Sequence, residues 1–289
     1  MIRQNTHFSI KYYYLCAGNQ CELVVCKRQL SDMIELRNLA TGYRSGGREK
    51  IVSRGVNATL GKGELTCLIG PNGIGKSTLL RTLASFQPML EGEIIIGGRP
   101  ASQLTSAEMS RLISVVLTDN TSICNLSAFD VVAMGRMPYT GFWGRLKPKD
   151  RHIVNECMGL VGVQHLADQM IDTLSDGERQ KTMIAKAIAQ QTPVILLDEP
   201  TAFLFYPNKV AVMMLLRRLA HGQGKAILLS IHDIDLALQV ADKVWLMDEK
   251  GNITVGTPAE LCSNGMITER IKGDGIQFDA ENRSFHVKV

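Results

Sequence analysis

Residues Gly70 to Ser77 have the types and the spacing of a phosphate-binding loop. They read Gly-Pro-Asn-Gly-Ile-Gly-Lys-Ser, which satisfies the pattern GxxxxGK[ST], and they follow an apolar stretch, Leu65–Ile69. Glycines let backbone N–H groups turn toward phosphates, and the helix that follows presents its positive end. Lys76 can neutralise the β- and γ-phosphates, and Ser77 can offer a hydroxyl to Mg²⁺. A purely structural glycine turn needs neither group, so the segment predicts a nucleotide site.

Two carboxylates and a histidine end two further apolar stretches. Asp198 and Glu199 follow Val194–Leu197, and His232 follows Ala226–Ser230. Because successive side chains on a strand diverge, the two acids can take different tasks. We expect Asp198 to join the Mg²⁺ shell and Glu199 to polarise the water that attacks the γ-phosphate. The alternatives are two acids that cap a helix start and a histidine with a structural role.

These groups require a scaffold that brings the ends of several strands together. From Met33 onward, short apolar runs alternate with helical patterns, which predicts βαβ units and a mainly parallel sheet flanked by helices. The strand–helix pairs are Leu65–Ile69 with Lys76–Leu83, Val194–Asp198 with Asn208–Leu219, and Ala226–Ser230 with Asp233–Ala241, followed by the strand Lys243–Met247. Between Ala128 and Asp172 helices take over, with Ile153, Cys157, Leu160 and Val161 on one stripe. We therefore expect a helical subdomain over about 120–175.

Length and composition bound the remaining possibilities. The 289 residues, at about 150 per domain, suggest two domains or one large α/β domain with a satellite. A net charge of +4 does not call for nucleic acid, and no apolar run approaches the roughly 18 residues of a membrane span. Residues 1–32 lack a secretory pattern, and we expect them to be either a disordered extension or one absent from the native protein, with Met33 as the start.

The last part of the chain carries two local signals. Lys250-Gly-Asn is a hairpin turn signal, and Thr257-Pro-Ala-Glu260 has the cap, the first-turn proline and the acid of a helix start. Beyond Cys262 the sequence is polar and weakly patterned. We therefore divide the chain into an extension (1–32), a nucleotide-binding unit (33–262) and a tail (263–289).

The segment Leu174-Ser-Asp-Gly-Glu-Arg-Gln180 resembles the LSGGQ signature of the ATP-binding cassette (ABC) family. The order of phosphate loop, helical insertion, signature, acidic pair and histidine matches the nucleotide-binding subunit of ABC transporters, over about residues 34–261. The resemblance implies the ABC ATPase form of the P-loop NTPase fold, including an antiparallel β portion. It also implies that two cassettes bind head to tail, each ATP lying between the phosphate loop of one and the signature of the other.

The resemblance assigns roles residue by residue. Tyr43 would stack on adenine, with an exposed loop tyrosine as the competing interpretation, and His232 would act on the γ-phosphate beside the catalytic Glu199. The residues expected to bind ATP are Tyr43, Gly70, Pro71, Asn72, Gly73, Ile74, Gly75, Lys76, Ser77 and Thr78. Those expected to face the ATP of the partner are Leu174, Ser175, Asp176, Gly177 and Glu178, with Ser175 and Gly177 in contact. The metal ligands would be Ser77 and Asp198, with Thr118 as a weaker candidate.

Four positions depart from the family pattern. Thr118, followed by Asp119, stands where the family has a glutamine that touches Mg²⁺. Phe205 stands where an aspartate ties the loop across the dimer, and an aromatic ring cannot accept those hydrogen bonds. Asp176 and Glu178 place acids in the signature, where they should repel the partner's phosphates unless they point outward.

The segments Phe129–Tyr139 and Glu199–Leu204 look like the branch that powers import of iron–siderophore chelates, haem and vitamin B12. The leading hypothesis is thus an ATP-hydrolysing importer subunit that uses ATP and Mg²⁺. It would form a homodimer peripheral to the cytoplasmic face of the membrane and serve a permease and, indirectly, a solute-binding protein. Phe142 and Trp143 are candidate permease contacts. The alternatives are a cassette with weak turnover that acts as a binding module, and a soluble ABC ATPase outside transport.

Overall fold

The computed structural model describes residues 13–17, 20–24, 32–45, 48–117, 124–141, 144–270, 276–279 and 283–287. Of the predicted extension, residues 1–12, 18–19 and 25–31 lie outside these ranges. Its two strands, β1 (Tyr13–Ala17) and β2 (Gln20–Val24), pair as an antiparallel hairpin. The next strand, β3, begins at Asp32 and opens the nucleotide-binding unit.

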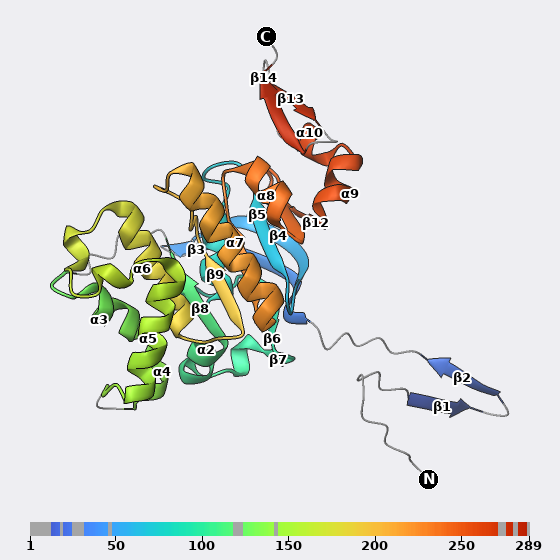
Figure 1. Ribbon diagram of the computed structural model, residues 1–289. Coiled ribbons are helices and arrows are strands. Elements are labelled where there is room, and N and C mark those ends of the chain that lie inside the picture. Colours follow the sequence, from blue (N-terminus) through green and yellow to red (C-terminus); the bar gives the residue numbers. More distant parts are fainter. Residues whose placement is uncertain are drawn as a thin grey trace.

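A six-stranded, mainly parallel sheet lies at the centre of the molecule (Figure 1). Across the sheet the strands are β12 (Ile253–Gly256), β11 (Lys243–Met247), β5 (Leu65–Ile69), β10 (Ala226–Ser230), β9 (Val194–Leu197) and β8 (Ile113–Val116). Neighbours run parallel except for the edge pair of β11 and β12. The predicted parallel sheet is confirmed, and the carboxyl ends of β5, β9 and β10 meet at one edge.

A second, antiparallel sheet packs against one face of the first. Its order is β4 (Arg48–Gly61), β3 (Asp32–Ser45), β6 (Glu91–Ile96) and β7 (Arg99–Pro100). Alternate residues of the central strands enter two different cores, because side chains on a strand alternate between faces. Leu196 lies in the core shared with the antiparallel sheet, whereas Ile195 and Leu197 lie in the core beneath the helices. The antiparallel portion implied by the family resemblance is therefore confirmed.

The helices complete the layers and the insertion. Those that follow the strands of the two sheets are α1 (Lys76–Leu83), η1 (Ala101–Gln103), α2 (Ser106–Leu112), α7 (Tyr206–Gln223) and α8 (Ile234–Val240). The insertion contains α3 (Ala128–Ala133), η2 (Met134–Arg136), α4 (Met137–Thr140), α5 (Pro148–Val161), η3 (Gln164–Leu166) and η4 (Ile171–Thr173), and it leads into α6 (Asp176–Ala189). Buried Arg136 joins these helices, because it contacts Asp150 and donates to the carbonyl of Ala189.

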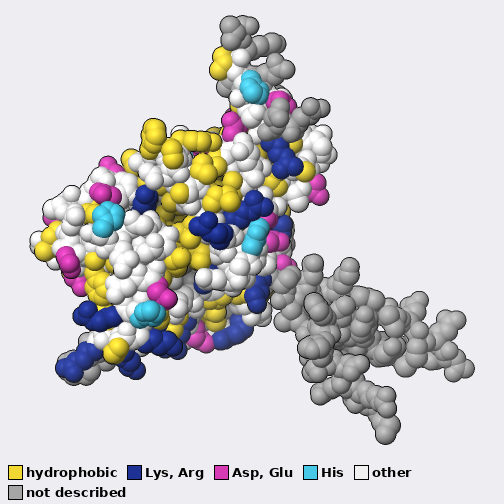
Figure 2. All heavy atoms as spheres, viewed as in Figure 1, with side chains coloured by type: hydrophobic (Ala, Val, Ile, Leu, Met, Phe, Trp, Pro, Cys, Tyr) yellow, Lys and Arg dark blue, Asp and Glu magenta, His cyan; other side chains and the backbone are white. Residues whose placement is uncertain are grey.

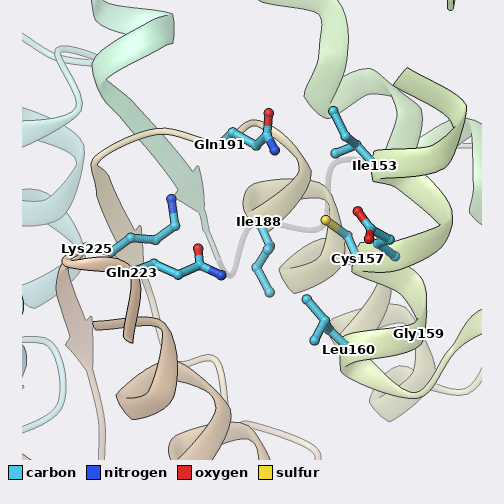
Figure 3. A pocket seen from close by; sticks show the side chains of 9 residues that line it. Ile153, Cys157, Gly159, Leu160, Ile188, Gln191, Gln223 and Lys225 are labelled. Carbon is cyan, nitrogen blue, oxygen red and sulfur yellow. The ribbon is translucent and has the colours of Figure 1, made fainter. Parts of the chain in front are cut away.

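The predicted apolar stripe of α5 is correct at three of its four positions. Ile153, Cys157 and Val161 are buried in the core, but Leu160 is 52% exposed. Leu160 lines a groove between α5 and the carboxyl-terminal ends of α6 and α7, which Figure 3 shows with Lys225 on the opposite side. Including Leu160 in the stripe was wrong, because it lies at the flank of the buried face, whereas the next residue, Val161, still points into the core.

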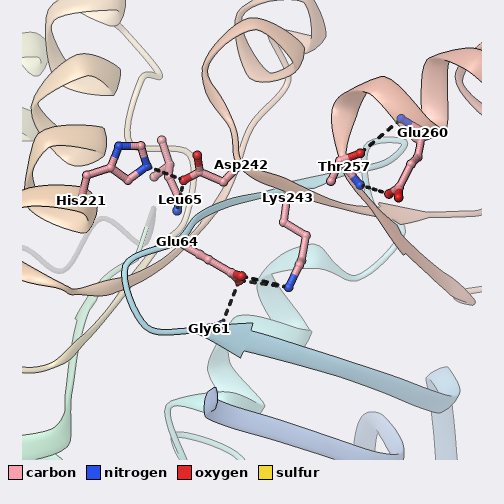
Figure 4. A network of polar contacts seen from close by, with 8 residues as sticks. All are labelled: Gly61, Glu64, Leu65, His221, Asp242, Lys243, Thr257 and Glu260. Atoms are coloured by element: carbon pink, nitrogen blue, oxygen red, sulfur yellow. Dashed lines mark hydrogen bonds and ion pairs between the residues drawn. The ribbon is translucent and has the colours of Figure 1, made fainter. Parts of the chain in front are cut away.

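Hydrogen bonds and an ion pair connect the amino-terminal ends of β5 and β11, at the end of the sheet opposite the phosphate loop (Figure 4). Asp242 accepts hydrogen bonds from the Leu65 N–H and from His221, and Lys243 pairs with Glu64. The predicted hairpin after β11 is confirmed by its antiparallel pairing with β12. These contacts fix β5 and β11 in register and so position the start of the phosphate loop.

The predicted helix start at Thr257 is confirmed, because Thr257 and Glu260 form a reciprocal capping box at the start of α9 (Pro258–Ser263) (Figure 4). The tail holds α10 (Met266–Arg270) and a hairpin of β13 (Ile276–Asp279) and β14 (Ser284–Val287). Phe278 and Phe285 pack against the core beneath the helices.

Charge is unevenly spread over the face drawn in Figure 2. Lys and Arg side chains gather at its lower left, where α4 leads into α5 and where Arg145, Lys147, Lys149 and Arg151 are exposed. In the part of the chain that the structure describes, no helix is long and apolar enough to cross a membrane.

Candidate functional site

The phosphate loop leaves the carboxyl end of β5 and enters α1, as predicted. Gly73 and Gly75 have φ angles of 74° and 115°, in the region that favours glycine. A Cβ atom on Gly75 would lie 1.9 Å from Cγ1 of Val52, so this position accepts no larger residue without rearrangement. Gly75 is also the N-cap of α1, with no side-chain cap. The free amides of the first helical turn therefore point into the loop and can bind an anion.

Lys76 places a buried positive charge inside this loop. Its side chain is 5% exposed, and its Nζ donates to the carbonyls of Gly70 (2.8 Å) and Pro71 (3.0 Å). Burial lowers the pKa of Lys76, whereas the charges of Glu199 and Asp198 raise it. The loop thus holds its cation beside both acids, as the sequence predicted.

The two acids lie immediately beyond the carboxyl end of β9. Asp198 is 1% exposed, its N–H donates to the carbonyl of Val116, and its Oδ1 accepts a 2.6 Å hydrogen bond from Ser230 Oγ. Glu199 has φ 48°, which is uncommon for a residue with a side chain. This turn, rather than the alternation of a continuing strand, separates the two carboxylates. The predicted strand alternation was wrong as a reason for different tasks, because β9 ends at Leu197, before both acids.

The structure brings Glu199 and His232 into direct contact. His232 Nε2 lies 2.5 Å from Glu199 Oε1, and both side chains are partly exposed. His232 comes from the segment after β10, the strand that pairs with β9. The predicted order of groups along the sheet edge therefore places a carboxylate, a histidine and a buried lysine together.

Tyr43 and Thr78 lie at the flank of the phosphate loop. The Tyr43 hydroxyl is 2.6 Å from Thr78 Oγ1, and the tyrosine is 45% exposed. An exposed ring tied to the first turn of α1 can reach a base bound beside the loop. Ser77 is half-buried on the same turn, whereas Pro71, Asn72 and Gly73 are exposed and Ile74 packs against a core.

The signature-like segment caps α6. Ser175 is the N-cap, and its hydroxyl donates to Glu178 Oε2 (2.6 Å) and accepts from the Glu178 N–H. The hydrogen bond from the Ser175 side chain lowers the pKa of Glu178, and the bond from its backbone adds to this. Leu174 is buried, while Asp176 is exposed and pairs with Arg179. Glu178 therefore turns back onto Ser175, and Asp176 faces solvent.

The loop between Glu199 and α7 contacts the signature and presents aromatic rings. A Cβ atom on Gly177 would lie 3.3 Å from Leu204 Cδ2, so the two segments touch. Phe205 is 77% exposed, and its neighbours Phe203 and Tyr206 are exposed as well.

Four residues singled out from the sequence, Thr118, Asp119, Phe142 and Trp143, lie outside the described residues. One group that the sequence analysis missed is Ser230, which contacts both acids. The signal for it was a polar residue at the end of an otherwise apolar strand.

A glycine loop with a buried lysine, acids beyond a neighbouring strand and a histidine beyond the next define a P-loop nucleotide hydrolase. The family model for ABC transporters matches residues 53–202, which is more than half of the chain. The chain therefore belongs to the ABC transporter ATP-binding family and is an ATP hydrolase of the ABC type.

Relatives extend this match over most of the chain. An uncharacterized ABC transporter ATP-binding protein of Methanocaldococcus jannaschii is 39% identical over 237 residues, 82% of this chain and 80% of that protein. The petrobactin import ATP-binding protein YclP of Bacillus subtilis is 35% identical, over 82% of this chain and 92% of that protein. The ferric enterobactin transport ATP-binding protein FepC of Escherichia coli is 34% identical, over 77% and 82%.

Solved structures agree with the fold. The dimeric structure of a bacterial ABC transporter cassette superposes with a TM-score of 0.71 at 26% identity, covering 78% of this chain and 99% of that one. An inward-facing putative metal-chelate type ABC transporter gives a TM-score of 0.70 at 26% identity, over 88% and 95%.

Proposed function

We propose that this chain is the ATP-hydrolysing subunit of an importer for iron–siderophore, haem or cobalamin. The relatives named for ferric enterobactin and petrobactin, and the neighbour described as a metal-chelate type transporter, support this class of cargo. The segments Phe129–Tyr139 and Glu199–Leu204 support the same branch.

The working assembly would contain two copies of the chain and membrane partners. The dimeric cassette structure supports a homodimer, and the transport names of the relatives support a separate permease and an associated solute-binding protein. The chain would then act at the cytoplasmic face of the membrane as a peripheral subunit. ATP would close the dimer, and hydrolysis would open it.

The residues around the phosphate loop fit Mg²⁺. The Ser77 hydroxyl lies on the first turn of α1 beside buried Lys76, and the charge of Asp198 opposes the lowering of the Lys76 pKa that burial causes. Hydroxyl and carboxylate oxygens are the hard ligands that Mg²⁺ prefers. When bound, the ion neutralises charge on the β- and γ-phosphates. Lys76 would exchange its two carbonyl contacts for phosphate oxygens. Thr118 stays a predicted further ligand.

Glu199 would take the proton of the attacking water. Its contact with His232 is the observation that carries the proposed hydrolysis, because a partly exposed carboxylate is held by a neighbouring imidazole beside the loop lysine. His232 would orient this carboxylate and, by the family resemblance, meet the γ-phosphate. The remaining roles follow the sequence prediction: Tyr43 would stack on adenine, and Ser175 and Gly177 would meet the partner's ATP.

Transport by a reconstituted complex tests this proposal. The chain would be purified with its permease and placed in liposomes together with the solute-binding protein, and labelled ferric siderophore, haem and cobalamin would be supplied one at a time. Uptake of at least one chelate is expected with ATP and wild-type chain, and not with Glu199→Gln. Uptake of none of the three would contradict the proposed cargo class, whether or not ATP is hydrolysed.

A second candidate function is a cassette that binds ATP and turns over poorly. The observation that favours it is the exposed ring of Phe205, which cannot accept the hydrogen bonds expected across the dimer at this position.

A further inference from the structure

Ser230 joins the two acids of the site through a single hydroxyl. It is the last residue of β10 and is fully buried. Its Oγ accepts a 2.9 Å hydrogen bond from the Glu199 N–H and donates a 2.6 Å hydrogen bond to Asp198 Oδ1. A hydroxyl can donate and accept at the same time, whereas a methyl group can do neither.

Glu199 needs such a restraint because its backbone is in an uncommon conformation. A non-glycine residue with φ 48° persists only where its surroundings hold it. Two hydrogen bonds hold this peptide: the Glu199 N–H donates to Ser230 Oγ, and the Glu199 carbonyl accepts from the Ala202 N–H at 3.0 Å. The direction of the backbone at this point decides where the carboxylate lies.

The same neighbouring strand supplies both points of attachment. Ser230 accepts a hydrogen bond from the backbone N–H of Glu199, and His232, two residues further along the chain, contacts the Glu199 carboxylate. We propose that Ser230 is a positioning residue: its hydroxyl holds the Glu199 backbone so that the Glu199 carboxylate has the orientation needed for hydrolysis, and it also restrains the Asp198 carboxylate. This inference rests on the proposed role of Glu199 in hydrolysis.

The chain offers a matched control for removing a buried strand hydroxyl. Ser114 is buried on β8 in the same sheet, and its hydroxyl contacts only the Val194 carbonyl, 3.5 Å away at the opposite end of β9, among the hydrogen bonds of the described residues. Ser114→Ala therefore removes the same atom without touching either acid. Ser230→Thr keeps the hydroxyl and tests for rescue.

The first readout is amide hydrogen exchange at Glu199 in the nucleotide-free protein, which does not depend on activity. Removing the acceptor of the Glu199 N–H should raise its exchange rate about tenfold in Ser230→Ala, because the amide then exchanges from a freer conformation. Ser114→Ala and Ser230→Thr should leave this rate near that of the wild type.

The second readout separates kcat from KM. In Ser230→Ala we expect kcat for ATP hydrolysis to fall about tenfold and KM for ATP to change less than about twofold, because the phosphate loop is untouched. Equal kcat in Ser230→Ala and Ser114→Ala, or an unchanged Glu199 exchange rate, would overturn the inference. A Ser230→Thr variant as slow as Ser230→Ala, with Glu199 still protected, would overturn it too.

Glu199→Gln, measured alongside, distinguishes the two failures. If Glu199→Gln hydrolyses ATP at the wild-type rate, the proposed role of Glu199 fails. If Glu199→Gln is inactive while Ser230→Ala matches Ser114→Ala, only the inference about Ser230 fails.

Discussion

Tyr43 offers two separable contributions, one from its ring and one from its hydroxyl. The ring is exposed beside the phosphate loop, and the hydroxyl bonds Thr78 on α1. Tyr43→Ala removes both groups, whereas Tyr43→Phe removes only the hydroxyl. Comparison of the two variants distinguishes stacking of the ring on adenine from a purely structural role of Tyr43.

The expected magnitudes follow from these contacts. Base–aromatic stacking contributes about 1–3 kcal/mol, so Tyr43→Ala should weaken ATP binding between about 5-fold and about 150-fold. Tyr43→Phe should bind ATP within about twofold of the wild type, because the ring remains. It should also lose about 0.5–1.5 kcal/mol in free energy of unfolding through the lost hydrogen bond to Thr78.

Calorimetric titration with ATP and with inorganic tripolyphosphate is the decisive assay. Tripolyphosphate carries the charge that the loop binds but has no base, so Tyr43→Ala should bind it as the wild type does. If Tyr43→Ala weakens both ligands equally, the ring acts by shaping the loop, and the stacking argument is refuted.

Three further variants test other contacts. Arg136→Met leaves the buried Asp150 carboxylate without its cation and should lower the urea unfolding free energy by about 3–5 kcal/mol; a loss below about 1 kcal/mol would contradict this. Phe205→Asp should change the ATPase rate of the reconstituted complex less than about twofold, and a large increase would favour the poorly hydrolysing alternative. Although burial raises the pKa of Asp248, hydrogen bonds from Arg270 and Asn252 lower it to about 2, below its ordinary 3.8. The stability from Asp248 is thus present above pH 3.8 and lost as the pH falls toward 2, and Asp248→Asn should remove that dependence.

Local patterns predicted the elements that carry the site. The phosphate loop can be recognised in the sequence because few other structures need its combination of residues. Gly73 and Gly75 allow positive φ angles, and a lysine and a hydroxyl follow at the start of a helix. The parallel strands were predictable because strands covered on both faces are continuously apolar. Their shared edge then placed Glu199 and His232 together.

The unpredicted features depend on contacts between distant segments. Periodicity could not show how wide the buried face of α5 is, so it included Leu160, which lies at the flank of that face while Val161 is buried. Glu178 turns onto Ser175 through a capping box, whose sequence signature was present, although the sequence alone left open whether this acid faces the partner or points outward. A polar residue at the end of an apolar strand pointed to Ser230, but its contacts with both acids depend on the pairing of β9 with β10.

Glu199 is proposed to drive ATP hydrolysis in a site whose nucleotide-binding groups are separate from it. The most direct test is the Mg²⁺-dependent ATPase rate of Glu199→Gln, with ATP affinity measured on the same sample. We expect hydrolysis to fall at least about a hundredfold while ATP affinity stays within a few-fold of the wild type, because Lys76 and its loop remain intact. Hydrolysis at the wild-type rate would contradict it.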